Sequence, residues 1–121
     1  MKTITVFRGD GIGPEITDAV IEILNHAKAD LDYEIFDVGE AVFNKCQEYI
    51  PQQALDSFQK NKVLLKSPIT TPIGKGFRSL NVTLRTKYDL WANIRPAKSN
   101  PALDTYFKDI DIVTFREKYR R

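Results

Sequence analysis

The residues best suited to chemistry lie between positions 66 and 96, where hydroxyl, amide and guanidinium groups alternate with apolar side chains. Asn81 and Arg85 are four residues apart, so they would share one face of a helix. Ser79 stands at the expected start of that helix, where its hydroxyl and the free backbone N–H groups could bind a carboxylate. Arg95 ends an expected strand and offers a planar guanidinium for bidentate carboxylate binding. Together these donors suit a small, multiply charged anion.

The charge distribution points the same way. Residues 60–100 contain nine Lys or Arg and a single acid, Asp89, for a net charge of +8. Residues 1–59 contain four basic and eleven acidic residues, for a net charge of −7, so the whole-chain value of +2 hides the asymmetry. A solvated basic surface remains the simple alternative. However, these cations alternate with Ile, Leu, Val and Trp, so we expect some of them to be partly buried.

A glycine-rich turn, Gly9-Asp10-Gly11-Ile12-Gly13-Pro14, follows an expected strand and opens an expected helix. Such a turn can bring backbone N–H groups and a helix N-terminus close to a ligand. It is not the dinucleotide-binding fingerprint, because its sixth position is proline rather than glycine. From the spacing alone, glycines that merely make a tight strand-to-helix connection are the stronger alternative.

The pattern of strands alternating with helices indicates one α/β domain over residues 1–121, with a mostly parallel sheet flanked by helices. We expect a sheet of four or five strands, drawn from residues 3–8, 33–38, 62–66, 90–94 and 110–115. Helices are expected at 14–28, at 41–48, after Pro51 and at 78–87. The first helix should pack on the sheet through Ile16, Val20, Ile23 and Leu24.

Composition excludes several classes of protein. The 42% apolar content argues against a disordered chain, and no apolar run is long enough to cross a membrane. One cysteine, Cys46, permits neither an internal disulfide nor a cysteine-based zinc site, and one histidine, His26, leaves little for a metal centre. Because no signal peptide or presequence is evident, we expect a cytoplasmic protein.

Four segments resemble the isocitrate/isopropylmalate dehydrogenase family in order and spacing across residues 3–117. They are GDGIGPEI at 9–16, KSPITTPIGKGFRSLNVTLR at 66–85, DLWANIRPAKS at 89–99 and IVTFRE at 112–117. The segment from Ser79 to Arg85 is similar to the isocitrate branch. The resemblance implies the N-terminal part of the family's large domain, with the small domain and the C-terminal half absent.

The resemblance also implies roles for individual residues. Five match the family residues that bind the isocitrate carboxylates and hydroxyl: Ser79, Asn81, Arg85, Arg95 and Arg116. Lys66 matches a lysine at the edge of that pocket. Thr70 and Thr71 match a loop near the substrate and nicotinamide, and Ile12 matches a turn that faces the nicotinamide. The implied ligand is a small tricarboxylate that resembles isocitrate.

The implied parent reaction is the oxidative decarboxylation of isocitrate to 2-oxoglutarate, a step of the tricarboxylic acid cycle that uses NAD or NADP and Mg²⁺ or Mn²⁺. No residue of this chain matches the family's catalytic tyrosine and lysine, its metal-binding aspartates or its adenosine-binding loop. We therefore expect a truncated relative that binds neither metal nor dinucleotide alone and that does not catalyse the reaction alone.

Two alternatives remain. One is a non-catalytic module that binds a tricarboxylate, regulates another protein or pairs with a full-length homologue. The other is a nucleic-acid binder that uses the basic residues 60–100, which we rank last because aromatic residues are not interleaved there for base stacking. Half a domain should also leave apolar surface uncovered, so we expect self-association.

Overall fold

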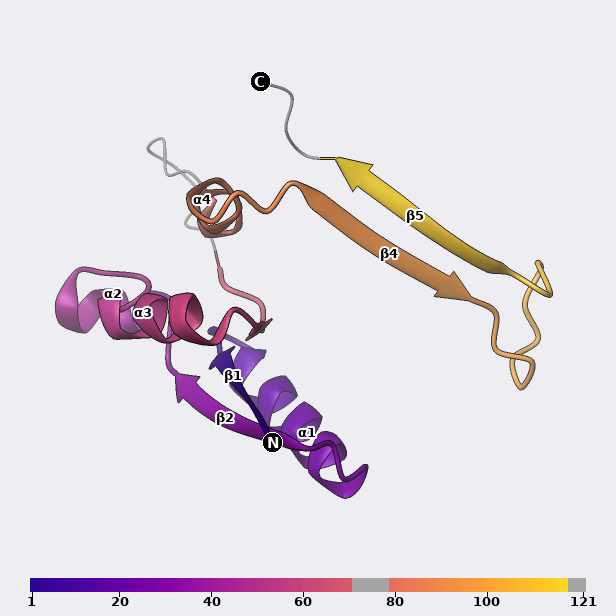
Figure 1. Ribbon diagram of the computed structural model, residues 1–121, viewed down its shortest axis with the longest axis horizontal. Coiled ribbons are helices and arrows are strands. Elements are labelled where there is room, and N and C mark those ends of the chain that lie inside the picture. The colour runs from indigo at the N-terminus through magenta and orange to yellow at the C-terminus, as the bar shows by residue number, and fades with distance from the viewer. Residues whose placement is uncertain (71–78, 118–121) are drawn as a thin grey trace. The chain divides into compact units, whose positions relative to one another are not determined.

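The computed structural model describes residues 1–70 and 79–117 (Figure 1). The chain divides into two compact units, Met1–Lys75 and Gly76–Arg121, and each is described by itself. The expectation of one domain over residues 1–121 stays a prediction.

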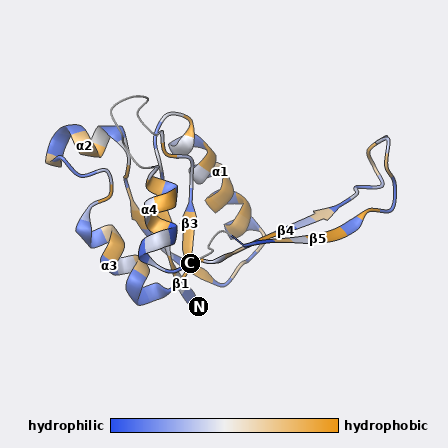
Figure 2. Cartoon of the chain, turned by 90° about the horizontal axis from the view of Figure 1, so that it is seen from above, coloured by the Kyte–Doolittle hydropathy of each residue, from blue (hydrophilic) through white to orange (hydrophobic). Residues whose placement is uncertain are grey.

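The first unit is built around a three-stranded parallel sheet in the order β2-β1-β3. Its elements are β1 (Lys2–Phe7), α1 (Gly13–His26), β2 (Leu31–Phe36), α2 (Glu40–Cys46), α3 (Gln52–Asn61) and β3 (Leu64–Lys66). The chain passes from β1 outward to β2 and then back across β1 to β3. Right-handed crossovers therefore place α1 on one face of the sheet and α3 on the other, as Figures 1 and 2 show.

The centre of this unit is β1, which is paired on both edges. Val6 lies opposite Ile35 and Leu65, and both Val6 and Phe7 are fully buried. Ala54 and Phe58 of α3 are also buried in the core. Central position and burial of both faces explain why four successive residues of β1, Ile4 to Phe7, are buried, with Thr5 among them.

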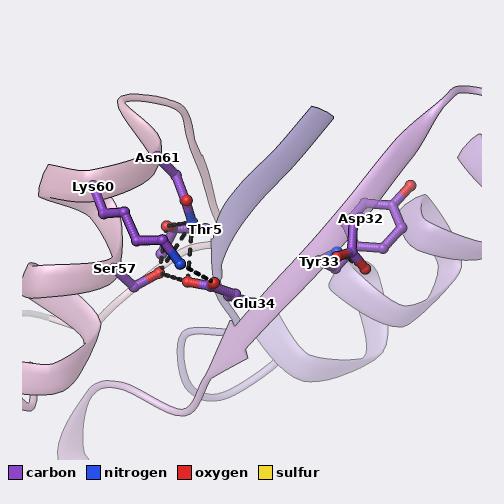
Figure 3. A network of polar contacts seen from close by, with 7 residues as sticks. All are labelled: Thr5, Asp32, Tyr33, Glu34, Ser57, Lys60 and Asn61. Carbon is purple, nitrogen blue, oxygen red and sulfur yellow. Dashed lines mark hydrogen bonds and ion pairs between the residues drawn. The ribbon is translucent and has the colours of Figure 1, made fainter. Parts of the chain in front are cut away.

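One polar network crosses this core between β1, β2 and α3 (Figure 3). Asn61 donates to the Thr5 hydroxyl at 3.1 Å, and the Thr5 and Ser57 hydroxyls lie 2.7 Å apart. Ser57 donates to the Glu34 carboxylate at 2.6 Å, and Lys60 donates to the same carboxylate at 3.1 Å. Because each buried hydroxyl has a partner, Thr5 and Ser57 can be buried without the cost of an unsatisfied polar group.

The second unit contains α4 (Leu80–Lys87), β4 (Ala92–Lys98) and β5 (Asp111–Glu117). β4 and β5 pair antiparallel in a two-stranded ribbon, with Ile94 opposite Phe115 and Lys98 opposite Asp111. Residues 99–110 connect the two strands, and Ser99 bonds to Ile110 at the base of this connection.

The α/β fold class, with a parallel sheet flanked by helices, is confirmed. The prediction of one mostly parallel sheet of four or five strands was wrong: the described strands form a parallel sheet of three and an antiparallel sheet of two. Parallel neighbours need a long crossover, usually a helix. Residues 99–110 contain no described helix, so β5 returns beside β4 in the opposite direction.

The packing face of α1 is also partly different from the prediction. Val20 and Leu24 are half-buried, but Ile16 is 42% exposed and Ile23 is 66% exposed. The buried residues of this helix are instead Gly13 and Thr17. The Thr17 hydroxyl donates to the Gly13 carbonyl at 2.8 Å, which satisfies it within the helix and lets a polar residue occupy the inner face.

The network around Glu34 should make stability depend on pH. The hydrogen bond from Ser57, followed by those from Lys60 and Asn61, lowers the pKa of Glu34 in the folded protein. The stabilisation is therefore present above the usual glutamate pKa of about 4.3 and is lost as the pH falls through the lower folded value. Urea unfolding from neutral pH downwards should show a steeper acid loss for the wild type than for Glu34→Gln.

The exposed Glu22 of α1 is the matched control, since no hydrogen bond or ion pair reaches its carboxylate within the described residues. Glu22→Gln should follow the wild-type profile. If Glu34→Gln also follows it, the network does not couple Glu34 ionisation to folding.

Candidate functional site

The register of the β4–β5 ribbon brings two of the predicted arginines together. Asn93 lies opposite Arg116, and Arg95 lies opposite Thr114. Since side chains alternate along a strand, all four project from one face of the ribbon. Arg95 and Arg116 are diagonal neighbours on that face, a relation that typically sets residues about 7–8 Å apart, within reach of long side chains. One small polycarboxylate could therefore contact both guanidinium groups.

These two arginines are free to bind an external anion. The Arg95 Nε donates to the Asn93 amide oxygen at 3.3 Å, which leaves the outer guanidinium nitrogens available. Within residues 1–70 and 79–117, no carboxylate forms an ion pair with Arg95 or Arg116. By contrast, Lys98 pairs with Asp111 at 3.6 Å on the same ribbon. The fixed positive charge is thus concentrated on the face that carries the arginines.

The middle of the opposite face of the ribbon is apolar, between the Lys98–Asp111 pair at one end and Glu117 at the other. Ile94 pairs with Phe115 and Pro96 with Val113, and Ile94 and Phe115 are 57% and 71% exposed. An isolated two-stranded ribbon is at best marginally stable in water. This face is therefore a surface that further packing would stabilise.

The segment around α4 presents the other predicted carboxylate ligands. Ser79 is the N-cap residue of α4, and its side chain makes no capping hydrogen bond, so its hydroxyl is not used by the helix. Asn81 and Arg85 are four apart on this helix and both are half-buried. No acidic residue lies in the first turn to compete for an anion. The helix expected at 78–87 is confirmed at Leu80–Lys87, with residue 78 outside the described residues.

In the first unit, the glycines at positions 9 and 13 allow the turn to contact the chain after β3. A Cβ at Gly9 would lie 2.0 Å from the Pro68 carbonyl oxygen, and one at Gly13 would lie 2.5 Å from the Arg8 carbonyl oxygen. At Gly11, by contrast, none of the described residues comes within 4 Å of the Cβ position. Close packing therefore explains two of the three glycines, whereas at Gly11 the described part of the chain leaves open space.

The same contact brings together the residues predicted to lie near the nicotinamide. Ile12 is 66% exposed in the turn, just before α1. Thr70 is tied to that turn, because its backbone N–H and its hydroxyl donate to Asp10 Oδ1 at 2.8 and 2.7 Å. Lys66 is half-buried at the end of β3, and its Nζ donates to the Ser67 carbonyl at 2.6 Å. Thr71 lies outside the described residues.

Asp10 is a residue that the sequence analysis missed. Besides Thr70, it accepts a hydrogen bond from the backbone N–H of Glu40 at 3.2 Å. Burial works against its ionisation, but the bonds from Thr70 and Glu40 and the charge of Lys66 hold the pKa of this carboxyl below its usual range. In the sequence, the only feature that marks Asp10 is its position as a single carboxylate between two glycines.

The described residues contain no group of three or more His, Cys, Asp or Glu side chains that could hold a metal ion. Cys46 is a free, exposed cysteine. None of the described helices is long and apolar enough to span a membrane. Among the described residues, the groups that could bind a ligand are therefore mainly cations and hydrogen-bonding side chains.

Comparison with known proteins decides the family. The model of the isocitrate/isopropylmalate dehydrogenase family matches residues 3–120. The chain belongs to this family. A crystal structure of isocitrate dehydrogenase from Methylococcus capsulatus is similar in fold, with a TM-score of 0.86 and 42% identity over 97% of this chain and 34% of that one.

Curated relatives cover both branches of the family. The chain is 44% identical over 115 residues to catalytic subunit 5 of the mitochondrial NAD isocitrate dehydrogenase of Arabidopsis thaliana, covering 95% of this chain and 31% of the relative. It is 43% identical over 119 residues to the NADP isocitrate dehydrogenase of Thermus thermophilus, covering 96% and 24%. It is 44% identical over 113 residues to the chloroplastic 3-isopropylmalate dehydrogenase of Solanum tuberosum, covering 93% and 32%. The family member thus spans a third or less of each curated relative.

The packing role of Gly9 can be measured against Gly11. Both have positive φ, +72° and +59°, so alanine is strained at either position by about 1–2 kcal/mol. Only Gly9→Ala adds a steric overlap, with Pro68, and overpacking of this kind costs about 1–3 kcal/mol more. Urea unfolding should therefore show Gly9→Ala to be the less stable variant. Equal stability of the two variants would show that the turn does not pack against Pro68 as described.

Proposed function

We propose that this chain supplies the carboxylate-binding groups of an isocitrate site, in a protein whose parent reaction is the oxidative decarboxylation of isocitrate with NAD or NADP. The observation that carries the proposal is the placement of Arg95 and Arg116 on one face of the β4–β5 ribbon without an acidic partner within the described residues. Membership of the isocitrate/isopropylmalate dehydrogenase family supports a small polycarboxylate as the anion.

In this proposal the arginines bind and orient the substrate. Two guanidinium groups on one face can each form paired hydrogen bonds to a carboxylate, which fixes the position of the anion as well as neutralising its charge. The Ser79 hydroxyl and the half-buried Asn81 and Arg85 of α4 would contribute further donors. The excess of cations over acids within residues 60–100 would favour the approach of a polyanion.

The first unit would provide part of the surface for the nicotinamide. The open space at Gly11 and the exposed apolar side chain of Ile12 fit a flat, uncharged ring, and Thr70 offers a hydroxyl beside them. A nicotinamide bound there would accept a hydride from the substrate carbon that carries the hydroxyl. The roles of Lys66 at the edge of a substrate pocket and of Thr71 near the nicotinamide stay predictions that rest on the family resemblance.

The described residues do not fit the Mg²⁺ or Mn²⁺ that the family uses, since they present no cluster of carboxylates. This observation favours the second candidate, a non-catalytic module that binds a tricarboxylate. Pairing with a second copy or with a full-length homologue would cover the apolar face formed by Ile94, Pro96, Val113 and Phe115. We propose the cytoplasm as its location.

Isocitrate should bind weakly and through Arg95. Because the described residues present no metal-binding cluster to assist, we expect a dissociation constant of roughly 1 mM, equivalent to about −4 kcal/mol. Arg95→Ala should remove about 1.5–3 kcal/mol of charge-assisted hydrogen bonding, which makes binding undetectable. The measurement is a backbone NMR titration with isocitrate, and with a monocarboxylate as the ligand control.

Lys98→Ala is the matched protein control. It removes the same charge from the same strand, but from the apolar face, so it should leave binding unchanged. If the two variants weaken binding equally, only general charge attracts the anion and no site exists on the arginine face.

Turnover separates the two candidate functions. We expect purified chain, supplied with isocitrate, Mg²⁺ and either dinucleotide, to form no NADH or NADPH, because its described residues offer no metal-ligand set. Absorbance at the reduced-nicotinamide band measures this directly. Reproducible cofactor reduction would reject the non-catalytic module and show that the chain acts as an enzyme by itself.

A further inference from the structure

We propose that Asp10 is the positioning residue that sets the Thr70 loop against the turn carrying Ile12. Its carboxylate uses both oxygens: Oδ1 accepts the Thr70 N–H and hydroxyl at 2.8 and 2.7 Å, and Oδ2 accepts the Glu40 N–H at 3.2 Å. One side chain therefore joins the glycine turn, the chain after β3 and the start of α2. The link to a nicotinamide rests on the proposed function, whereas the link among the three segments does not.

The backbone of Asp10 reinforces these contacts. Its N–H donates to the Pro68 carbonyl at 3.2 Å, and its carbonyl accepts the Gly13 N–H at 2.8 Å. Asp10 thus contacts the 66–70 segment through both main chain and side chain. A shift of that segment would have to break the hydrogen bonds of Asp10 to Pro68 and Thr70 together.

The glycines around Asp10 show that the three segments it joins pack closely against one another. A Cβ at Gly39 would lie 2.4 Å from Asp10 Oδ2, so only glycine lets α2 begin this close to the carboxylate. On the other side, Gly9 leaves the same kind of room for Pro68. The three segments are in direct contact, which allows Asp10 to act on Thr70 without an intervening water.

Asp10 also decides what Thr70 can offer a ligand. The Thr70 hydroxyl has one proton and donates it to the carboxylate, so its oxygen can only accept a further hydrogen bond. A group that donates an N–H, such as the carboxamide of a nicotinamide, matches this polarity. Without the carboxylate, the hydroxyl could rotate and the preference would be lost.

Amide hydrogen exchange tests the positioning role on the whole chain. In Asp10→Ala, the amides of Thr70 and Glu40 should exchange about tenfold faster or more, because each loses a hydrogen bond to a charged acceptor. The buried amides of β1 should keep their wild-type rates. Asp37→Ala is the control: it removes an exposed carboxylate close to α2, whose described partner is Arg8 at 3.9 Å, and should change neither Thr70 nor Glu40.

The conservative variant Asp10→Asn should change amide exchange in a pattern that a general loss of stability would not produce. In Asp10→Asn the amide oxygen can still accept from Thr70, but the NH₂ group that replaces Oδ2 cannot accept from Glu40. Protection should therefore return at Thr70 and stay lost at Glu40. If both alanine and asparagine variants leave the two amides at wild-type rates, the proposal is overturned.

Two further measurements cover the case in which Asp10→Ala unfolds and test the link to the cofactor. Should Asp10→Ala unfold, as faster exchange throughout β1 would show, Thr70→Val tests the same contact by removing only the exposed hydroxyl. It should speed exchange at position 70 several-fold, and an unchanged rate would overturn the proposal. Addition of NAD⁺ to the wild type tests the cofactor link separately, against the expectation from the sequence that the chain alone binds no dinucleotide: shifts of the Ile12 and Thr70 resonances would support the link. If NAD⁺ moves neither while the exchange results hold, Asp10 positions the loop but the proposed cofactor role fails.

Discussion

The pairing register of β4 and β5 is the constraint on which the candidate anion site depends. Because side chains alternate, this register groups Arg95 with Arg116 and groups Ile94 with Phe115 on the other face. A slip of one residue would set Arg95 beside Phe115 and would mix charged with apolar side chains on both faces. The closing contacts between Ser99 and Ile110 fix the connection at the base of the ribbon and so help to hold the register.

The first unit follows a related rule, in which polar groups determine how closely segments approach. Thr5 and Ser57 satisfy one another between the sheet and α3, and Ser67 donates to the Gly13 carbonyl at 3.0 Å between β3 and α1. Asp10 fills the same role at the edge of the sheet. The buried bonds of Thr5, Ser57 and Ser67 are costly to break, because a group that loses its partner there stays away from water.

The positions of several helices and strands could be predicted from local sequence patterns. The run Val63–Leu65, the proline at position 14 and the helical spacing of Asn81 and Arg85 located β3, α1 and α4 to within about two residues. The cluster of cations pointed to Arg85 and Arg95, because residue type and local charge need no knowledge of pairing. Arg116 came from the family resemblance, and the binding role of all three stays a prediction. Non-local features were harder. The antiparallel return of β5, which sets Thr114 opposite Arg95, and the contact of Asp10 with Thr70 depend on partners 19 and 60 positions away.

The most direct test of the central claim is to observe both arginines of the ribbon in a single titration. The side-chain Nε–Hε resonances of Arg95 and Arg116 report on each guanidinium separately, and isocitrate is the titrant. If one anion is bound between them, both resonances should move with the same dissociation constant, while a monocarboxylate moves neither comparably. Two different dissociation constants, or a response from only one arginine, would contradict the claim that this face of the ribbon is a single carboxylate-binding site.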